Sequence, residues 1–277
     1  MDTIEKVVEN IKSVRVQGAK QIAIYSLKFL RKFCKKEGFK LKFEVVTKVL
    51  EEARPTAVVL HNCLEILKKK RKLSTIDDLI RTLEKSTEKI AIKGSKLIKT
   101  NYKIMTHCHS GEALAVIKKS WKNGKKISVI ATETDPLEQG VKTAKELLKV
   151  KIPVTLITDN AVGFFMKDVD CVIVGSDAIR KEGIVNKIGT SLLAFAAKEN
   201  KKLFYVAANT LKFDRRKKFI IEERSPKEVY SELMHPGNLK NVRIRNPAFD
   251  ITTWKFITAV ITERGILRPK QVLRFLK

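Results

Sequence analysis

The sequence predicts an α/β protein in which a helical N-terminal domain precedes a parallel sheet with crossover helices. Three repeats of one pattern carry this prediction: an apolar run with strand character, a polar turn and a helical pattern. The repeats lie at residues 103–117, 125–140 and 152–166, and a fourth strand pattern at 169–179 ends in a turn with a carboxylate. Buried β-branched strands that alternate with amphipathic helices are typical of parallel sheets.

Residues 1–100 are the predicted helical domain, and residues 101–277 are the predicted sheet domain. Gly18 marks a turn, and Pro55 disfavours helix at Arg54, so Thr56 is expected to cap the helix that follows. Asp77 and Asp78 are expected in the first turn of the last helix. Helical patterns cover residues 4–11, 21–36, 43–52, 57–70 and 74–98.

The C-terminal part continues with the segment 183–199, in which Asn186 and Lys187 are expected at the start of a helix. Free backbone N–H groups and the positive end of the helix dipole would suit an anion there. A strand ends near Asn209, and residues 214–241 are charged and predicted to be irregular surface. The apolar run Phe256–Ile261 is the expected contact between subunits.

Composition bounds the class of protein. The chain has 277 residues and a hydrophobic fraction of 44%, enough for a real core. The apolar runs are too short to cross a bilayer, and the first twelve residues mix charges unlike a secretory signal, so we expect a cytoplasmic protein without a membrane role. The four cysteines have neither metal-ligand nor disulfide spacing, so we expect no metal site. These cysteines are Cys34, Cys63, Cys108 and Cys171.

The charge balance is strongly basic. Lysine and arginine number 57 against 30 acidic residues, which gives a net charge of +27. Attraction to RNA or an acidic partner is one interpretation, and a lysine-rich surface composition is the other. Because lysine is spread over nearly the whole chain and no RNA-binding signature is present, we favour surface composition.

Polar residues gather at the predicted carboxyl ends of the strands, where ligands bind in open parallel sheets. They are Cys108 and Ser110, residues 133–135, Asp159 with Asn160, and Asp177. Cys108 lies beside a predicted helix N-terminus, which is expected to lower the pKa of its thiol. Asp177 ends a strand, where a carboxylate can act as a general acid or base. One pocket built from several strand ends is therefore predicted.

Motifs in order along the chain carry a family resemblance. They are residues 54–57 (RPTA), 105–110 (MTHCHS), 132–134 (TET), 139–140 (QG), 174–177 (VGSD), 186–190 (NKIGT), 212–213 (KF) and 246–250 (NPAFD). From Val16 onward the chain resembles the family that joins the alpha, beta and delta subunits of translation initiation factor 2B with two sugar-phosphate isomerases. These are 5-methylthioribose-1-phosphate isomerase and archaeal ribose-1,5-bisphosphate isomerase.

The resemblance implies a helical N-terminal domain, a Rossmann-like C-terminal domain for ligand binding and oligomerisation, and a homodimer or higher homo-oligomer. It implies that Cys108 and Asp177 match the catalytic pair of the isomerases. Positions that contact the ligand in the family match Gly18, Arg54, Ser110, Asn186, Lys187 and Lys212. The implied ligand is a sugar phosphate or a nucleotide.

Two departures from the family pattern concern phosphate binding. The isomerases carry arginine where this chain has Gln17 and Asp135, and both arginines bind phosphate in the family. Arginine gives bidentate, charge-assisted hydrogen bonds to phosphate, whereas an aspartate repels it. A smaller departure is Thr253-Trp254, where prolines are usual.

Two hypotheses follow. The first is an archaeal, non-catalytic regulatory subunit like those of translation initiation factor 2B, which acts through contacts with a translation initiation factor. The second is a cofactor-independent ribose-1,5-bisphosphate isomerase that uses Cys108 and Asp177 as its acid–base pair. We favour the first, because of the lost phosphate arginines and the high positive charge. Whether the chain is an enzyme stays open at this point.

Overall fold

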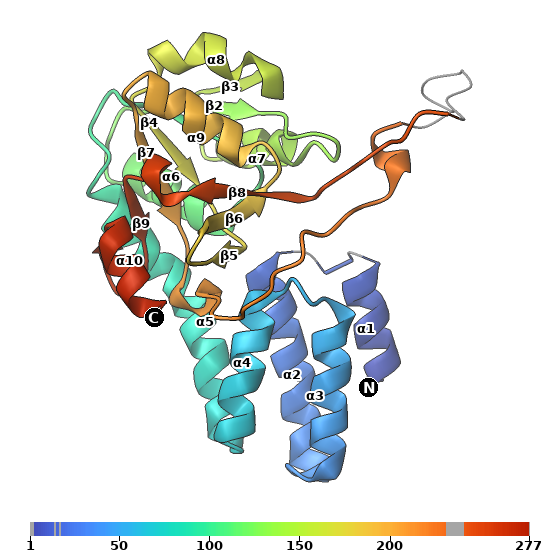
Figure 1. Cartoon of the computed structure of the whole chain (residues 1–277). Coiled ribbons are helices and arrows are strands. Elements are labelled where there is room, and N and C mark those ends of the chain that lie inside the picture. Colours follow the sequence, from blue (N-terminus) through green and yellow to red (C-terminus); the bar gives the residue numbers. More distant parts are fainter. Residues whose placement is uncertain (1–2, 14, 17, 231–240, 277) are drawn as a thin grey trace.

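The computed structural model describes residues 3–13, 15–16, 18–230 and 241–276. Figure 1 shows a bundle of helices from the N-terminal part beside a twisted sheet with helices on both of its faces. The predicted α/β class is confirmed, with a helical N-terminal region and a mostly parallel sheet. The division at residue 100 stays a prediction.

The helical bundle packs around fully buried apolar side chains, among them Leu27, Phe43 and Leu64. Thr56 does not cap the fourth helix as predicted, because its hydroxyl bonds Glu222 and Ala57 takes the cap position. The fifth helix begins at Leu73, so Asp77 lies beyond its first turn and pairs with an arginine of the second helix instead. The helices are α1 (Ile4–Lys12), α2 (Ala19–Glu37), α3 (Leu41–Ala53), α4 (Val58–Lys69) and α5 (Leu73–Ser95).

The large sheet has the order β10-β9-β7-β4-β1-β2-β3. The pairings among its strands are parallel, apart from the antiparallel pairing of β10 with β9. The strands are β1 (Lys103–Thr106), β2 (Ser128–Thr132), β3 (Val154–Ile157), β4 (Cys171–Val174), β7 (Leu203–Ala207), β9 (Ala259–Ile261) and β10 (Ile266–Leu267).

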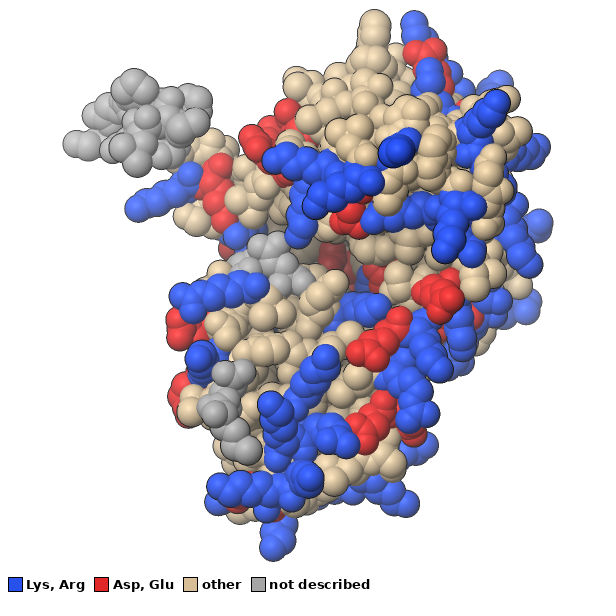
Figure 2. All heavy atoms as spheres, turned by 180° about the vertical axis from the view of Figure 1, so that it is seen from behind, with Lys and Arg blue, Asp and Glu red and all other residues tan. Residues whose placement is uncertain are grey.

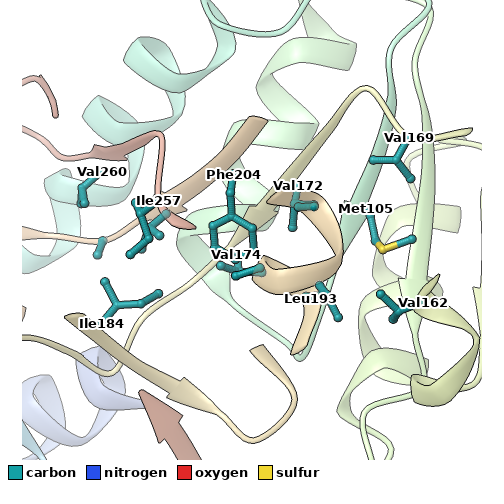
Figure 3. Packing of buried hydrophobic residues seen from close by; sticks show 14 of the residues in the cluster. Met105, Val162, Val169, Val172, Val174, Ile184, Leu193, Phe204, Ile257 and Val260 are labelled. Carbon is teal, nitrogen blue, oxygen red and sulfur yellow. The ribbon is translucent and has the colours of Figure 1, made fainter. Parts of the chain in front are cut away.

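Helices cover both faces of this sheet. Alternate residues of a strand point to opposite faces, so Met105 and Val172 join one core while Ile104 and Cys171 join the other. The first core, drawn in Figure 3, is closed by α8 (Val162–Phe165), α9 (Thr190–Glu199) and α10 (Pro269–Phe275). The second is closed by the end of α5, α6 (Gly111–Lys122) and α7 (Gln139–Leu148). Short 3₁₀ turns lie at Asp159–Ala161, Met166–Asp168, Thr210–Lys212, Pro226–Glu228 and Trp254–Phe256.

A second, antiparallel sheet has the order β5-β6-β8. Its strands are β5 (Ala178–Ile179), β6 (Gly183–Lys187) and β8 (Phe249–Thr253). The prediction that Asn186 and Lys187 begin a helix is therefore wrong. Both residues end β6, where they pair with Asp250 and Phe249, and α9 begins only at Thr190.

An arm formed by residues 214–230 and 241–248 runs away from the body of the molecule (Figure 1). The sequence predicted that this segment is irregular surface, but the beginning of the arm is partly buried. Asp214 is buried and lies 2.6 Å from the guanidinium of Arg180. Phe219 and Ile221 pack against Val58 of the helical bundle and the strands of the small sheet.

The apolar run Phe256–Ile261 does not offer a subunit contact. Its second half is β9, an interior strand between β7 and β10, in which Val260 and Ile261 are fully buried. The prediction of a subunit contact at this run is therefore wrong, because Val260 and Ile261 already fill the cores on the two faces of the sheet.

Lysine and arginine side chains are scattered over both the helical part and the sheet part of the face in Figure 2. This view agrees with the interpretation of the +27 charge as surface composition. Among the described residues, no helix is both long and apolar enough to span a membrane.

Candidate active site

The strand order of the large sheet reverses between β1 and β4. Ligands bind at such a switch point, outside the carboxyl ends of the two strands. Cys108 and Ser110 follow β1, and Gly175 and Asp177 follow β4. Figure 2 shows the surface hollowed between the helical part and the sheet part, with acidic and basic side chains at the hollow.

Close packing at the switch point depends on Gly175. A Cβ atom added there would lie 2.3 Å from Ser110 Oγ and 3.9 Å from Asn186 Oδ1. Ser110 caps α6 by accepting a hydrogen bond of 3.3 Å from the N–H of Ala113. The structure thus brings two of the predicted ligand positions, Ser110 and Asn186, to the ends of β1 and β4.

Cys108 is held in an unusual backbone conformation. Its φ angle is +66°, in the left-handed region that residues other than glycine seldom adopt. Its N–H donates to Thr134 Oγ1 over 2.8 Å, and its carbonyl accepts from Thr143 Oγ1 over 2.8 Å. Strained backbone fixed by such bonds clusters at functional sites.

The Cys108 thiol is not acidified, which corrects the sequence-based expectation. Burial raises the pKa of the Cys108 thiol to about 12, and the carboxylates of Asp177 and Asp159 add to that effect. The N–H of His109 and the ammonium of Lys187 act in the opposite direction but do not outweigh burial. At neutral pH Cys108 is therefore a protonated thiol, suited to donate a proton.

The two histidines beside Cys108 turn away from it. His107 is buried, with Nδ1 2.6 Å from Thr132 Oγ1 and Nε2 2.7 Å from the carbonyl oxygen of Ile188. Because a carbonyl only accepts, Nε2 carries the proton, and burial lowers the pKa of His107 so that the ring is neutral. His109 contacts Thr143 and Glu146 instead. Both rings therefore hold loops in place.

Asp177 follows β4, on the other side of the switch point from β1 and Cys108. Its carboxylate makes no hydrogen bond or ion pair within the part of the chain that the structure describes, although its N–H bonds Val185. Burial raises the pKa of the Asp177 carboxyl, and Glu112 and Glu222 add to this, while Lys212 and Arg54 oppose it. A raised pKa makes the Asp177 carboxylate a stronger base.

Two of the predicted cations approach Asp177 from different parts of the chain. Lys212 Nζ lies 3.1 Å from the buried Glu112 carboxylate, which also accepts 3.0 Å from Asn209. Arg54, at the end of α3, reaches Glu222 of the arm over 3.3 Å. Both cations act electrostatically on Asp177, so the helical bundle does contribute to the site.

Lys187 approaches Cys108 from the end of β6. It is only 6% exposed, and burial lowers the pKa of its ammonium. The N-terminus of α9, which was predicted to bind an anion, is already occupied by the Asp250 carboxylate. Asp250 Oδ2 accepts a hydrogen bond of 2.9 Å from the N–H of Gly189 and one of 3.0 Å from the N–H of Ser191. An anion at this site would meet the Lys187 side chain and not the start of α9.

The remaining residues that the sequence predicted for the site are less close to the Cys108 thiol. Gly18 is an exposed residue with φ +83° just before α2, and no contact joins it to Cys108 or Asp177. Gln17 lies outside the described residues. Asp135 is exposed, and its N–H donates a hydrogen bond of 2.7 Å to Asp159 Oδ2. Burial raises the pKa of the Asp135 carboxyl, and the charges of Asp159 and Glu138 raise it further.

Three further residues shape the site: Thr134 and Asp159, which the sequence placed among the polar strand ends without giving them a role, and Arg224, which sequence reasoning missed. Thr134 and Asp159 fix the loops around Cys108, and Arg224 of the arm acts on Lys187. The polar turns after β2 and β3 signalled the first two. Nothing in the sequence indicated that Arg224 belongs to the site, because its charged segment resembles ordinary protein surface. Within the described part of the chain, no cluster of three or more His, Cys, Asp or Glu side chains is placed to hold a metal ion.

Comparisons with known proteins agree with this architecture. A sequence model of the initiation factor 2 subunit family matches residues 15–269. Two relatives named ribose 1,5-bisphosphate isomerase, from Archaeoglobus fulgidus and Methanocaldococcus jannaschii, are each 41% identical to this chain. Each match covers 98% of this chain, together with 91% of the first relative and 93% of the second. A crystal structure of translation initiation factor eIF-2B from Pyrococcus horikoshii OT3 superposes with a TM-score of 0.86 at 30% identity, over 99% of this chain and 98% of that one.

These findings correct the preference for a non-catalytic regulatory subunit. That hypothesis is wrong, because relatives that share 41% of their residues over nearly the whole chain are named as isomerases. With a family match over residues 15–269, the chain belongs to the initiation factor 2 subunit family.

Proposed function

We propose that the chain is a sugar-phosphate isomerase that converts ribose 1,5-bisphosphate from its aldose to its ketose form without a cofactor. The observation that carries this proposal is the pairing of a protonated thiol, Cys108, with the carboxylate of Asp177 across the switch point of the sheet. Among the described residues this carboxylate has no hydrogen-bond or ion-pair partner. The names of the archaeal relatives support the choice of substrate.

The proposed reaction needs only the movement of protons. The bond between C1 and the ring oxygen breaks, and the ring oxygen receives a proton. The C2–H bond breaks, a C1–H bond forms, and the C2 hydroxyl loses its proton as C2 becomes a carbonyl. Two hydrogens leave C2 and its oxygen, and two arrive at C1 and the former ring oxygen, so that atoms and electrons balance.

The two side chains suit complementary roles. Asp177 is the proposed base that takes a proton, since burial makes its carboxylate more basic than usual. Cys108 is the proposed acid, because a thiol whose pKa is about 12 keeps its proton at neutral pH. Proton transfer by positioned side chains contributes about 10²- to 10⁴-fold to a rate.

The proposed substrate-binding residues surround this pair. Arg54, Lys187 and Lys212 offer positive charge to phosphate oxygens, and Ser110 and Asn186 offer hydrogen bonds at the strand ends. Gly18, in the loop before α2, is the remaining proposed contact. A substrate with several negative charges does not cross membranes unaided, so we place the activity in the cytoplasm.

We also propose a homodimer or higher homo-oligomer joined through the sheet domain. Large apolar side chains are exposed on α8 and α9, two helices that contact each other: Phe164 is 69% exposed, Leu192 56% and Phe195 58%. Exposed apolar patches mark contacts between proteins. A monomer in light scattering at micromolar concentration would contradict this part of the proposal.

The reaction is tested by following ribose 1,5-bisphosphate with the full-length protein by ³¹P and ¹³C NMR in buffer containing EDTA. The expected result is loss of the C1 aldose signal and growth of a C2 carbonyl signal, with both phosphates retained. Release of inorganic phosphate, or an unchanged spectrum with folded protein, would overturn the proposal.

A further inference from the structure

The backbone of Cys108 is held on each side by one threonine hydroxyl. Its N–H donates over 2.8 Å to Thr134 Oγ1, and its carbonyl oxygen accepts over 2.8 Å from Thr143 Oγ1. Both threonines are buried, and within the described ranges no other hydrogen bond reaches the Cys108 N–H or carbonyl oxygen. Because residues other than glycine seldom adopt a φ of +66°, these two bonds keep Cys108 from relaxing to an ordinary backbone conformation.

The hydroxyl of Thr143 is oriented by His109. A carbonyl oxygen only accepts, so the single Thr143 proton is directed at Cys108. Thr143 Oγ1 can then only accept from His109 Nδ1, which lies 3.0 Å away, so this nitrogen must carry a proton. Burial lowers the pKa of His109, and the Glu146 carboxylate, 3.3 Å from Nε2, opposes this effect. Whether the ring holds one proton or two, the geometry requires a proton on Nδ1.

The hydroxyl of Thr134 is oriented by His107 in the opposite sense. The buried His107 ring carries its proton on Nε2, so its Nδ1 is an acceptor. This Nδ1 lies 2.6 Å from Thr132 Oγ1 and 3.4 Å from Thr134 Oγ1, and the two hydroxyl oxygens lie 3.2 Å apart. The two threonine protons are therefore drawn toward His107, which leaves the Thr134 oxygen free to accept from the Cys108 N–H.

We infer that His107 and His109, the two histidines that flank Cys108 in the sequence, are positioning residues for its thiol. His107 acts through Thr134 on the Cys108 N–H. His109 acts through Thr143 on the Cys108 carbonyl. The two rings need opposite protonation at Nδ1, which is bare in His107 and protonated in His109. The inference rests on the proposed function, because the thiol that the histidines position is the proposed acid.

The first test observes the two rings and the Cys108 backbone without substrate. Full-length protein is labelled with ¹⁵N-histidine and ¹³C-cysteine, and signals are assigned with His107→Gln, His109→Gln and Cys108→Ser. Long-range ¹H–¹⁵N spectra show which ring nitrogens carry protons, and the Cys108 Cα and Cβ shifts depend on its backbone conformation. At neutral pH we expect His107 to be protonated on Nε2 alone and His109 to be protonated on Nδ1.

The same spectra compare Thr143→Val with a matched control, Thr47→Val. Thr47 is also buried, and its hydroxyl also donates to a backbone carbonyl, that of Glu44 on α3 over 3.0 Å. Thr143→Val should move the Cys108 carbon shifts, because the carbonyl loses its donor. Thr47→Val should leave these shifts in place, although it removes a similar hydrogen bond.

The second test is steady-state turnover of ribose 1,5-bisphosphate. Thr143→Val and His109→Leu should each lower kcat by at least about tenfold, because a misplaced reacting group is costly. KM should change by less than about twofold, since neither side chain is a proposed substrate ligand. Thr143→Ser should restore kcat, and Thr47→Val should leave it unchanged.

The double variant His109→Leu/Thr143→Val should be no slower than either single variant, because both changes remove the same restraint on the Cys108 carbonyl. On the other side of Cys108, Thr134→Val should lower kcat in the same way, and Thr134→Ser should restore it. If Thr143→Val does not fold, His109→Leu is read in its place, since that ring is 20% exposed and lies at the edge of the network.

The inference is overturned if His109 carries a proton on Nε2 alone, or if Thr143→Val leaves the Cys108 shifts and kcat unchanged. It is also overturned if the effects of His109→Leu and Thr143→Val multiply in the double variant, since the two residues would then act independently. Absence of turnover by the wild-type chain would contradict the proposed function alone. The ring protonation and the Cys108 shifts would still decide whether the two histidines hold this backbone, because they are measured without substrate.

Discussion

Arg54 and Glu222 form an ion pair of 3.3 Å between residues 168 positions apart in the chain. The pair joins the end of α3 to the arm and holds the Arg54 guanidinium where its charge lowers the pKa of Asp177. The helical bundle therefore tunes a group that lies after β4, although it supplies neither member of the proposed catalytic pair.

Replacing Arg54 should change the pH dependence of the reaction. The raised pKa of Asp177 predicts that kcat/KM falls with acid at a pH above the ordinary range for aspartate, since the base must be unprotonated. Arg54→Met removes a charge that lowers this pKa, so the acid limb should move to higher pH. Arg245→Met, which breaks an exposed pair with Glu223, should leave the limb in place. A limb that does not move in Arg54→Met would show that Asp177 is not the titrating base.

Asp135 should weaken substrate binding in the present chain. It is exposed at the edge of the site, and its charge interacts with that of Lys187, a proposed phosphate ligand. Asp135→Asn should lower KM for the bisphosphate about fivefold, because like charges near contact repel by about 1 kcal/mol in water. Glu138→Gln, in the same loop, should have a smaller effect. Equal KM values for Asp135→Asn and wild type would mean that Asp135 faces away from the phosphate.

The buried ion pair of Arg180 and Asp214 should be important for stability. Their side chains are 5% and 1% exposed, so removing Asp214 leaves the buried Arg180 charge to the exposed Glu182 carboxylate, 3.2 Å away. Asp214→Ala should lower the free energy of unfolding by about 3–5 kcal/mol in chemical denaturation. Asp78→Ala, which removes an exposed ion pair with Arg81, should cost almost nothing. Similar losses in the two variants would contradict this account.

The Asp214 contribution should also depend on pH. Burial alone would raise the pKa of Asp214, but hydrogen bonds from Arg216 and Arg180 outweigh burial and hold that pKa below its ordinary value. A lowered pKa in the folded state means that the stabilisation is present above the ordinary aspartate pKa and is lost as pH falls through the lowered one. The stability difference between wild type and Asp214→Ala should therefore shrink in strong acid.

Much of the sheet could be predicted from local patterns. The runs that became β1, β2, β3, β4 and β7 are apolar and β-branched, and each is followed by a polar turn, so their type and parallel arrangement follow from the sequence. The sequence also predicts that Cys108 and Asp177, which come after two of these strands, lie at the same edge of the sheet, because the carboxyl ends of parallel strands share one edge.

Features set by distant residues could not be predicted in this way. The sequence of β6 resembles the start of a helix, because its short apolar run adjoins α9. Its pairing with β8 could not be predicted, because β8 lies more than 60 residues later. The thiol pKa depends on burial and on Asp177 and Asp159, none of which a local motif reveals. Arg224 acquires its neighbours only through folding of the arm.

The most direct test of the central claim compares turnover of ribose 1,5-bisphosphate by wild type, Cys108→Ser and Asp177→Asn, with binding and folding checked for each. We predict that wild type forms the ketose, and that both variants fold and bind the substrate but convert it about 10²- to 10⁴-fold more slowly. Wild-type rates in Cys108→Ser or Asp177→Asn, or no ketose from folded wild type, would contradict the claim that this thiol and this carboxylate carry the isomerisation.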